Sequence, residues 1–289
     1  MKINTDNKVL ACVDQSRFAE TVADYAAWAA QRMGAPLELL HVIERHPEFS
    51  TSQDHSGAIG LGAQDSLLDQ LSNEDEVRSR SQREAGRVFL NHLHKRAQAA
   101  GVAVVDMRQR HGDLAETLAD QQAEVRLFVL GRRGASAELS QRDLGRNLEW
   151  VVRAVERPIL AVKESYQEPT RVLLAFDGSS VTRRGVEMIA ASPLLKGLPI
   201  HVLMAGKPQA QGPKQIEWAQ QTLTEAGFMV TAEIVDGDPE SVINRTAQQG
   251  GHDLLVMGAY SHSPLRSLLL GSKTSELLRS SKMATLLLR

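Results

Sequence analysis

The chain has 289 residues, of which 42% are hydrophobic and 24% are charged, and its formal net charge is -2 at pH 7. This composition is typical of a globular protein with a substantial core, and the weak net charge excludes the basic surface of proteins that bind nucleic acid or anionic membranes. The length favours two domains over one, and the single cysteine, Cys12, excludes a disulfide framework.

The first part of the chain alternates short aliphatic runs with helical patterns. Strands are predicted at residues 8–13, 37–43, 102–108, 126–130 and 159–162. Between the first two, residues 19–33 carry alanine and aromatic side chains at helical spacing, and Gly34 follows as a helix stop. This alternation is typical of βαβ units, in which helices cover a parallel sheet.

The second part of the chain repeats the first. Residues 8–14 (KVLACVD) return as residues 171–177 (RVLLAFD) at an offset of 163, and His41-Val42 matches His201-Val202 at an offset of 160. Strands are predicted at residues 171–176, 200–204, 229–235, 254–257 and 285–288. We therefore predict an α/β protein of two tandem, doubly wound, Rossmann-like domains, each a five-stranded and mainly parallel sheet flanked by helices.

The two repeats differ in length because the first one contains an insertion. The later motifs, residues 111–113 with 236–238 and 127–131 with 254–258, match at offsets of only 125 and 127. The first copy thus carries about 35 additional residues, placed at about 44–76, and their serine and glycine content predicts a mobile loop or lid. We predict a first domain at 1–163, a polar linker at 164–169 and a second domain at 170–289.

A ligand site is expected where strand order reverses, beyond the carboxyl ends of the strands. In the second copy, Asp177 follows the first strand and Gly258 ends the fourth, so these two strand ends should be neighbours. A polar connection then leads to Gly271-Ser272 and a predicted helix at 273–280. Glycines and a helix start favour a bound phosphate, although Gly-Ser is equally an ordinary helix cap.

These motifs resemble the universal stress protein family, whose domain has an Asp after strand one, a His-Val end to strand two and a Gly-Asp before helix three. In its ATP-binding branch, the loop after strand four reads glycine, two residues, glycine, nine residues, then glycine and serine or threonine. The second copy has Gly258, two residues, Ser261, nine residues, then Gly271-Ser272. Serine at 261 departs from the pattern and is expected to weaken such a site without abolishing it.

The first copy departs further from the same pattern. It has Gly131, two residues, Gly134, ten residues, then Gly145, with Arg146 in place of serine or threonine. Arg146 either binds phosphates or occupies their place, and both readings stay open. Three more arginines surround this loop, and arginines on connecting segments are usually solvated: Arg132, Arg133 and Arg142. The second copy is therefore the favoured nucleotide site.

The resemblance implies roles for individual residues. Asp177 would hydrogen-bond the adenosine, and the backbone of Val202 would border the adenine. The phosphates would be held by Gly258, Ser261, Gly271, Ser272 and Lys273. The corresponding residues of the first copy are Asp14, Val42, Gly131, Gly134, Gly145 and Arg146. An alternative for Asp14 and Asp177 is that both are plain N-terminal helix caps.

The sequence contains no catalytic motif: no lysine-bearing phosphate loop, no serine elbow and no zinc-ligand spacing. We expect neither a catalytic residue nor a metal site. The resemblance implies a stress-response regulator that binds ATP as a signal, with or without Mg²⁺, or else ADP or AMP. The alternative is a scaffold of the same fold that recruits an unknown protein partner without nucleotide. The third reading is a weak ATPase.

Each copy should end in an exposed edge strand, at residues 157–162 and 284–289. Pairing these strands would cover both edges, and the family dimerises through this strand, so the tandem is expected to form a dimer-like pairing within one chain. Further homodimerisation is left open. Neither a signal sequence nor an apolar stretch of about 20 residues is present, which predicts a cytoplasmic protein without nucleic-acid or membrane partners.

Overall fold

The computed structural model of the chain describes residues 8–43, 63–133, 146–207, 209–259 and 277–289. The first half contains β1 (Lys8–Cys12), α1 (Ala19–Met33), β2 (Leu37–Ile43), α2 (Ala63–Ala99), β3 (Val105–His111), α3 (Leu114–Gln121), η3 (Gln122–Glu124), β4 (Val125–Gly131), α5 (Arg146–Ala154) and β5 (Ile159–Val162). The second half contains β6 (Val172–Ala175), α6 (Ser180–Ala191), η4 (Pro193–Leu195), β7 (Ile200–Ala205), α7 (Gly212–Glu225), β8 (Val230–Val235), α8 (Pro239–Gly250), β9 (Leu254–Gly258) and β10 (Ala284–Leu288).

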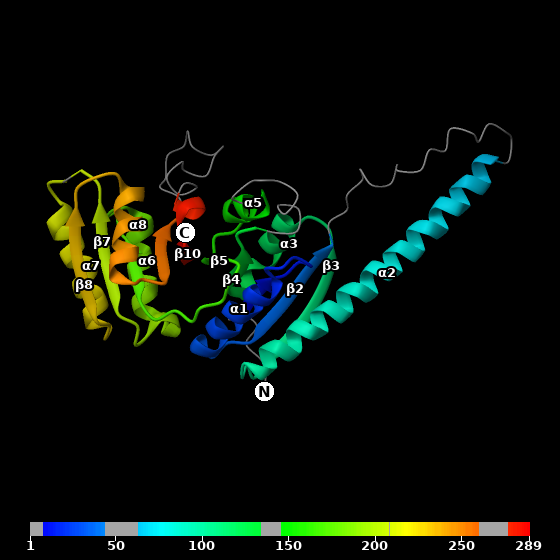
Figure 1. Cartoon of the computed structure of the whole chain (residues 1–289), viewed down its shortest axis with the longest axis horizontal. Helices are drawn as coiled ribbons and strands as arrows, with labels where there is room; N and C mark the ends of the chain where they lie inside the picture. The colour runs from blue at the N-terminus through cyan, green and yellow to red at the C-terminus, as the bar shows by residue number, and fades with distance from the viewer. Residues whose placement is uncertain (1–7, 44–62, 134–145, 208, 260–276) are drawn as a thin grey trace.

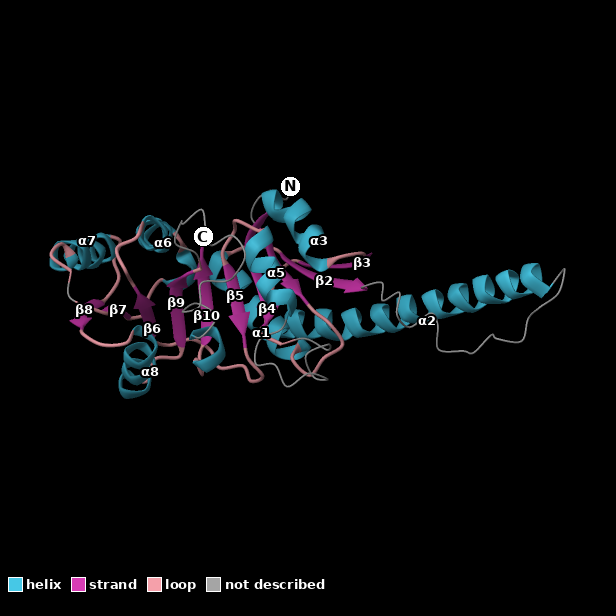
Figure 2. Ribbon diagram, turned by 90° about the horizontal axis from the view of Figure 1, so that it is seen from above, coloured by secondary structure: helices cyan, strands magenta, loops and turns pink. Residues whose placement is uncertain are grey.

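The ten strands of the described residues form one sheet in the order β3-β2-β1-β4-β5-β10-β9-β6-β7-β8. Neighbouring strands are parallel except for β5 and β10, which are antiparallel (Figure 1). Each half therefore has its strands in the order 3-2-1-4-5, which confirms the predicted pair of doubly wound α/β domains. Helices lie on both sides of the sheet (Figure 2).

The two terminal strands join the halves, as the edge-strand argument predicts. Leu160 lies opposite Leu286, while Ala161 faces Thr285 and Ile159 faces Leu287. This register relates the halves by an approximate twofold axis through the Leu160–Leu286 pair. The side chains of β5 and β10 are buried, so the core runs without interruption from one half to the other.

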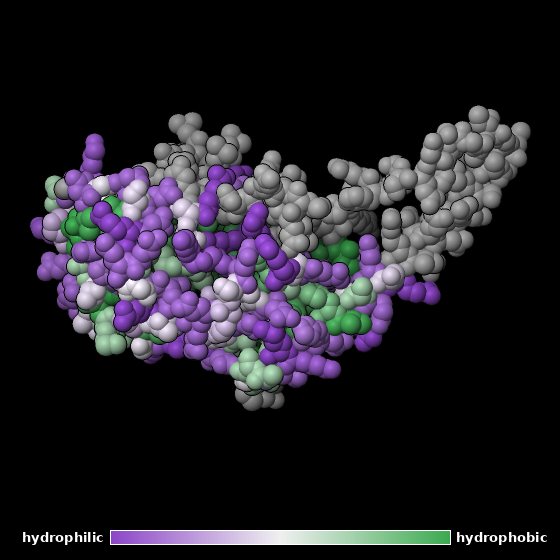
Figure 3. All heavy atoms as spheres, in the orientation of Figure 1, coloured by the Kyte–Doolittle hydropathy of each residue, from purple (hydrophilic) through white to green (hydrophobic). Residues whose placement is uncertain are grey.

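The core consists of two apolar layers, one on each face of the sheet. One layer packs against α1, α2, α6 and α7, and the other packs against α3, α5 and α8. Hydrophilic side chains cover most of the visible surface outside these layers (Figure 3). None of the helices within the described residues is long and apolar enough to cross a membrane.

Local signals set the helix ends. Helix α1 covers Ala19–Met33, as predicted, and Gly34 ends it in the left-handed conformation at φ +58°, where a side chain would be strained. Strand β3 begins at Val105, three residues after the predicted start. The reason is that the Val102 N–H caps the end of α2 by donating to the carbonyl of Ala97 and is therefore not available to a strand.

The predicted loop at 44–76 is wrong in its second part, because residues 63–76 belong to α2. The glycines of the insertion, Gly57, Gly60 and Gly62, all precede this helix, and residues 63–76 contain neither glycine nor proline. Residues 44–62 lie outside the described part of the chain. At about 1.5 Å per residue, the 37 residues of α2 extend well beyond the sheet, as Figure 1 shows.

Candidate functional site

Each half has a switch point where its first and fourth strands lie side by side. In the first half Cys12 of β1 pairs with Leu130 of β4, and in the second half Ala175 of β6 pairs with Met257 of β9. The expected neighbourhood of the two strand ends is thus present in both halves. The connection from β9 leaves the described residues directly after Ala259.

Asp177 follows β6 at the switch point of the second half. Its Oδ1 accepts hydrogen bonds from the Ser179 N–H at 3.0 Å and from the Thr182 hydroxyl at 2.8 Å. The N-terminal cap of α6 is Ser179, which accepts from the Thr182 N–H, so the cap interpretation of Asp177 is wrong. The Asp177 side chain is exposed, and no described residue donates to its Oδ2. One carboxylate oxygen is therefore fixed while the other faces solvent.

Asp14 holds the equivalent turn after β1. Its Oδ1 accepts from both the N–H of Ser16 at 3.2 Å and the Ser16 hydroxyl at 2.5 Å. Helix α1 begins later, after Phe18, and has no side-chain cap. The cap interpretation is therefore wrong for Asp14 as well. Both aspartates form Asx-type turns that orient their carboxylates at the strand end.

Gly131 and Gly258 end the fourth strands and lie against the first helix of each half. A Cβ on Gly258 would lie 3.3 Å from side-chain carbons of both Val181 and Thr182, so close packing of helix on strand explains this glycine without a phosphate. A Cβ on Gly131 would lie 2.8 Å from the backbone oxygen of Arg133, so the tight turn after β4 explains that glycine.

Val202 lies in the middle of β7, and its backbone faces away from the switch point. Alternate residues of a parallel strand direct N–H and C=O to opposite neighbours. The Ile200 N–H donates to Met229 beside β8, whereas the Leu203 carbonyl accepts from Phe176 beside β6. Val202 shares the orientation of Ile200, so its polar groups belong to the ladder with β8, and its side chain is fully buried.

The same register corrects the match between the two His-Val pairs. The Leu40 carbonyl accepts from Val13 as the Leu203 carbonyl accepts from Phe176, which gives an offset of 163 rather than 160 for these strands. Val42 therefore corresponds to Ala205. By the same alternation, the backbone groups of both residues turn toward the first strand, beyond its last residue. Sequence comparison missed Ala205 because the repeated dipeptide was three residues out of register.

Gln215 of α7 is a second residue that the sequence did not single out. Its side chain packs against Gly178, which has φ +73° and no Cβ to block the approach. The Oε1 of Gln215 is buried and accepts no hydrogen bond from the residues described. The equivalent position of α2, counted from the helix ends, is Phe89, whose ring packs edge-on against His41 at 5.5 Å. Within the described residues, the second half thus has a buried acceptor without a donor near its aspartate, where the first half has an aromatic ring.

Arg132 does not behave as a solvated loop arginine. Its guanidinium is buried and donates to the carbonyls of Leu278 at 3.0 Å, Ser281 at 2.7 Å and Met283, and to the Thr285 hydroxyl. Burial lowers the pKa of Arg132 to about 10. All four acceptors belong to the second half, so this side chain is directed into the interface between the halves.

Several predicted residues cannot be placed. Six residues that were predicted to bind phosphate lie outside the described part of the chain: Gly134, Gly145, Ser261, Gly271, Ser272 and Lys273. Arg146 is the first residue of α5, and its side chain lies outside as well. Of the predicted helix at 273–280, residues 277–280 are helical in the structure.

The described residues contain no group of three His, Cys, Asp or Glu side chains that could hold a metal ion. The two histidines of α2 point apart, because His92 contacts Glu20 whereas His94 contacts the carbonyl of Val105. Burial raises the pKa of the Cys12 thiol far above its ordinary value, with Glu38 and Asp14 adding repulsion. This thiol stays protonated and is a poor nucleophile.

Comparisons with known proteins agree with this architecture. The universal stress protein family matches residues 7–163 and again residues 169–289. Universal stress protein Slr1230 of Synechocystis sp. (strain ATCC 27184 / PCC 6803 / Kazusa) is 33% identical over 285 residues, which cover 97% of this chain and 99% of that protein.

Two solved structures share the fold over nearly the whole chain. A universal stress protein from Archaeoglobus fulgidus DSM 4304 matches with a TM-score of 0.68 and 18% identity, covering 97% of this chain and 95% of the other. The protein PA1789 of Pseudomonas aeruginosa PAO1 matches with a TM-score of 0.59 and 20% identity, covering 97% and 92%. Two successive family matches on a sheet of two equivalent halves lead to one conclusion: the chain belongs to the universal stress protein family, as a tandem of two of its domains.

Proposed function

We propose that the second half binds an adenine nucleotide as a regulatory signal. The observation that carries this proposal is Asp177, an exposed carboxylate at a switch point with Oδ1 fixed by two donors and Oδ2 open. An oriented carboxylate at this position is suited to accept hydrogen bonds from the hydroxyls of a ribose. The turn that orients it exists before any ligand binds, which lowers the entropic cost of binding.

Two further groups fit the same ligand. The backbone N–H and C=O of Ala205, rather than those of Val202, face the end of β6 and are suited to the edge of an adenine ring. The buried Oε1 of Gln215 lacks a donor among the described residues, and an amino or hydroxyl group of a nucleoside would supply one. The phosphates, with or without Mg²⁺, are assigned to Gly258, Ser261, Gly271, Ser272 and Lys273 on the family resemblance.

A role in signalling follows from the chemistry that the site offers. Asp177, Ala205 and Gln215 can bind and orient a nucleotide, and none of them is placed as an activated nucleophile or a general base. We therefore propose binding, with at most slow hydrolysis of ATP. The competing function is a scaffold without nucleotide. It is favoured by Ser261 and Arg146, where the chain departs from the family pattern, and by Arg132, whose charge is directed to the interface.

The test is to denature freshly purified protein, identify released nucleotide by mass spectrometry, and titrate the full chain with Mg-ATP by calorimetry. Asp177→Ala is compared with the matched variant Asp14→Ala, and melting temperatures check that both fold. We expect nearly equimolar nucleotide, an affinity lowered about tenfold or more in Asp177→Ala, and wild-type affinity in Asp14→Ala.

Other results would lead to other functions. Absence of binding at millimolar ATP would replace the proposal with the scaffold. Loss of binding in Asp14→Ala alone would move the site to the first half. Steady hydrolysis above a control without protein, abolished in Asp177→Ala, would make the protein an ATPase.

A further inference from the structure

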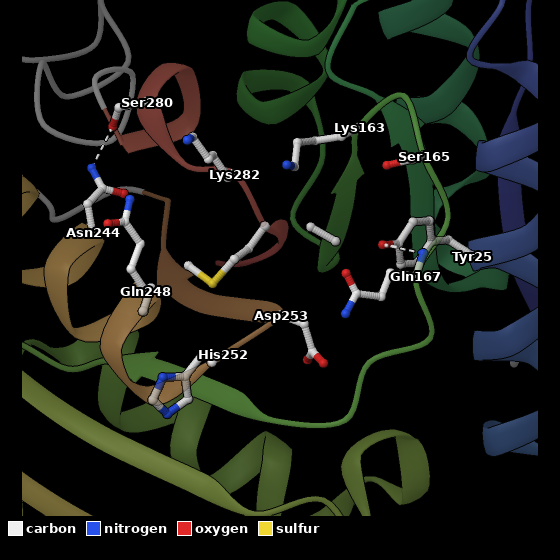
Figure 4. A pocket seen from close by; sticks show the side chains of 14 residues that line it. Tyr25, Lys163, Ser165, Gln167, Asn244, Gln248, His252, Asp253, Ser280 and Lys282 are labelled. Atoms are coloured by element: carbon white, nitrogen blue, oxygen red, sulfur yellow. Dashed lines mark hydrogen bonds between the residues drawn. The ribbon is translucent and has the colours of Figure 1, made fainter.

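A cavity of about 420 Å³ lies between the two halves, beside the junction of β5 and β10 (Figure 4). From the first half it is lined by Tyr25 and by the segment after β5, including Lys163. From the second half it is lined by α8 and by the segment that leads into β10, including Lys282. The cavity lies at the amino ends of β9 and β10, and none of the described residues assigned above to the nucleotide, namely Asp177, Ala205, Gln215 and Gly258, lines it. Asp177 follows the carboxyl end of β6, so it lies at the opposite ends of the parallel strands of that half.

Positive charge gathers at this cavity. Lys163 and Lys282 come from different halves, and their side chains lie on the same side of the cavity in Figure 4. Burial lowers the pKa of the half-buried Lys163, and the charges of Arg132 and Lys282 lower it further, against a weaker opposite effect of Glu164. Three cations thus lie near one another.

No carboxylate neutralises the two lysines within the described residues. The one carboxylate in the wall of the cavity is that of Asp253, and it accepts from the N–H groups of Thr170 and Arg171 and from the Thr170 hydroxyl. Asp253 therefore holds the chain between the halves. The lysine charges remain available to a ligand.

The fold itself does not require this pair of like charges. Gly131 pairs with Val162 as Gly258 pairs with Leu288, so the approximate twofold axis carries Lys163 onto Arg289. The same relation carries Lys282 onto Glu156. The place that the twofold axis relates to the cavity thus has Arg289 and Glu156, one cation and one anion, whereas the cavity has two cations. The like charges are a local feature that needs its own explanation.

Uncharged polar side chains supply much of the rest of the cavity wall, beside the apolar Ala247, Met283 and Ala284. Asn244 and Gln248 project from α8, and Ser280 accepts a hydrogen bond of 3.0 Å from the Asn244 amide. Gln167 faces them from the first half, with its N–H directed to the Tyr25 hydroxyl at 3.4 Å. Amides and hydroxyls supply both donors and acceptors, which is the complement that hydroxyl groups of a ligand need.

We propose that this cavity binds a small polyhydroxyl phosphate ester. Its phosphate lies between Lys163 and Lys282, and its hydroxyls lie along Asn244 and Gln248. The volume is within the range of small-molecule sites, roughly 300–1,000 Å³. Because the lysines belong to different halves, the bound phosphate removes their repulsion and ties the halves together.

The test uses the full chain at constant ionic strength, with sodium chloride as the compensating salt, and titrates glycerol 3-phosphate, inorganic phosphate and glycerol by calorimetry. The variants are Lys163→Gln and Lys282→Gln, with Lys196→Gln as a control that removes an exposed lysine elsewhere. Asp177→Ala serves as a second control for the nucleotide site. We expect glycerol 3-phosphate to bind more tightly than inorganic phosphate, with each cavity variant losing about tenfold in affinity and both controls unchanged.

Melting temperatures give an independent readout. Without ligand, Lys282→Gln should melt no lower than the wild type, because it relieves repulsion. Glycerol 3-phosphate should raise the melting temperature of the wild type and of both controls, and raise that of the two cavity variants less. Equal effects of phosphate and chloride would overturn the proposal, as would wild-type affinity in both cavity variants. Equal affinity for glycerol 3-phosphate and inorganic phosphate would overturn the ester as the ligand class. Loss of binding in Asp177→Ala alone would place the anion in the nucleotide site instead.

Discussion

The two halves of the chain have the same strand order but different side chains at three equivalent positions. These are Arg132 and Ala259 after the fourth strand, His41 and Met204 in the second strand, and Phe89 and Gln215 in the helix before the third. The first half directs a buried cation into the interface and packs an aromatic ring beside its second strand. The second half leaves a polar acceptor beside its exposed aspartate. A duplicated fold can thus stabilise the pair of domains through one copy and keep the other available to a ligand.

The pairing of β5 with β10 joins the two halves, so disrupting it should reduce the stability of the protein more than any other change proposed here. Leu286→Asp places a charge in a nearly fully buried position at the centre of the β5–β10 pair. We expect a loss of about 4 kcal/mol or more in the free energy of unfolding, with aggregation, and the same result for Leu160→Asp. Size-exclusion chromatography and thermal denaturation measure it. Met229→Asp, at a side chain 66% exposed, is the control and should melt like the wild type. A stable Leu286→Asp protein would show that the halves fold independently of this pair.

Arg132 tests the asymmetry of the interface. Arg132→Ala leaves the acceptors at Leu278, Ser281 and Thr285 without their donor in a buried setting. We expect a destabilisation of about 3 kcal/mol, measured by urea denaturation. Arg133→Ala, which changes the neighbouring and less buried arginine, should cost far less. Equal urea midpoints for the two variants would mean that Arg132 adds nothing to the docking of the halves.

Gln215 distinguishes the switch point of the second half from that of the first. Gln215→Leu removes a buried acceptor that lacks a donor within the described residues, so the free protein should be as stable as the wild type or up to about 1 kcal/mol more stable. Its affinity for adenine nucleotide should fall by about tenfold, because the nucleoside loses that acceptor. Calorimetry and thermal denaturation separate the two effects. Phe89→Leu in the first half should leave the affinity unchanged. Wild-type affinity in Gln215→Leu would remove this residue from the site.

Much of the candidate site followed from the sequence, but its details did not. The adjacency of the strand ends that precede Asp177 and end at Gly258 was expected from the doubly wound topology. The prediction of Val202 depended on a repeated His-Val pair, which suggested a register that the hydrogen bonds contradict. The cap interpretation of Asp14 and Asp177 failed because the caps depend on where each helix turn begins, which differs by only two to four residues.

The strands along the chain, the duplication and the stop of α1 at Gly34 could be predicted from the sequence, because each depends on periodicity, on a repeat or on a residue's own backbone preference. The pairing of the two edge strands was expected with the help of the family resemblance. Tertiary structure alone decided the register of β7, the partners of Arg132 and the charged cavity between the halves. Arg132 and Leu278 are 146 residues apart, and Lys163 and Lys282 meet only once β5 and β10 have paired. Contacts of that separation are set by packing of the whole sheet, which no local pattern encodes.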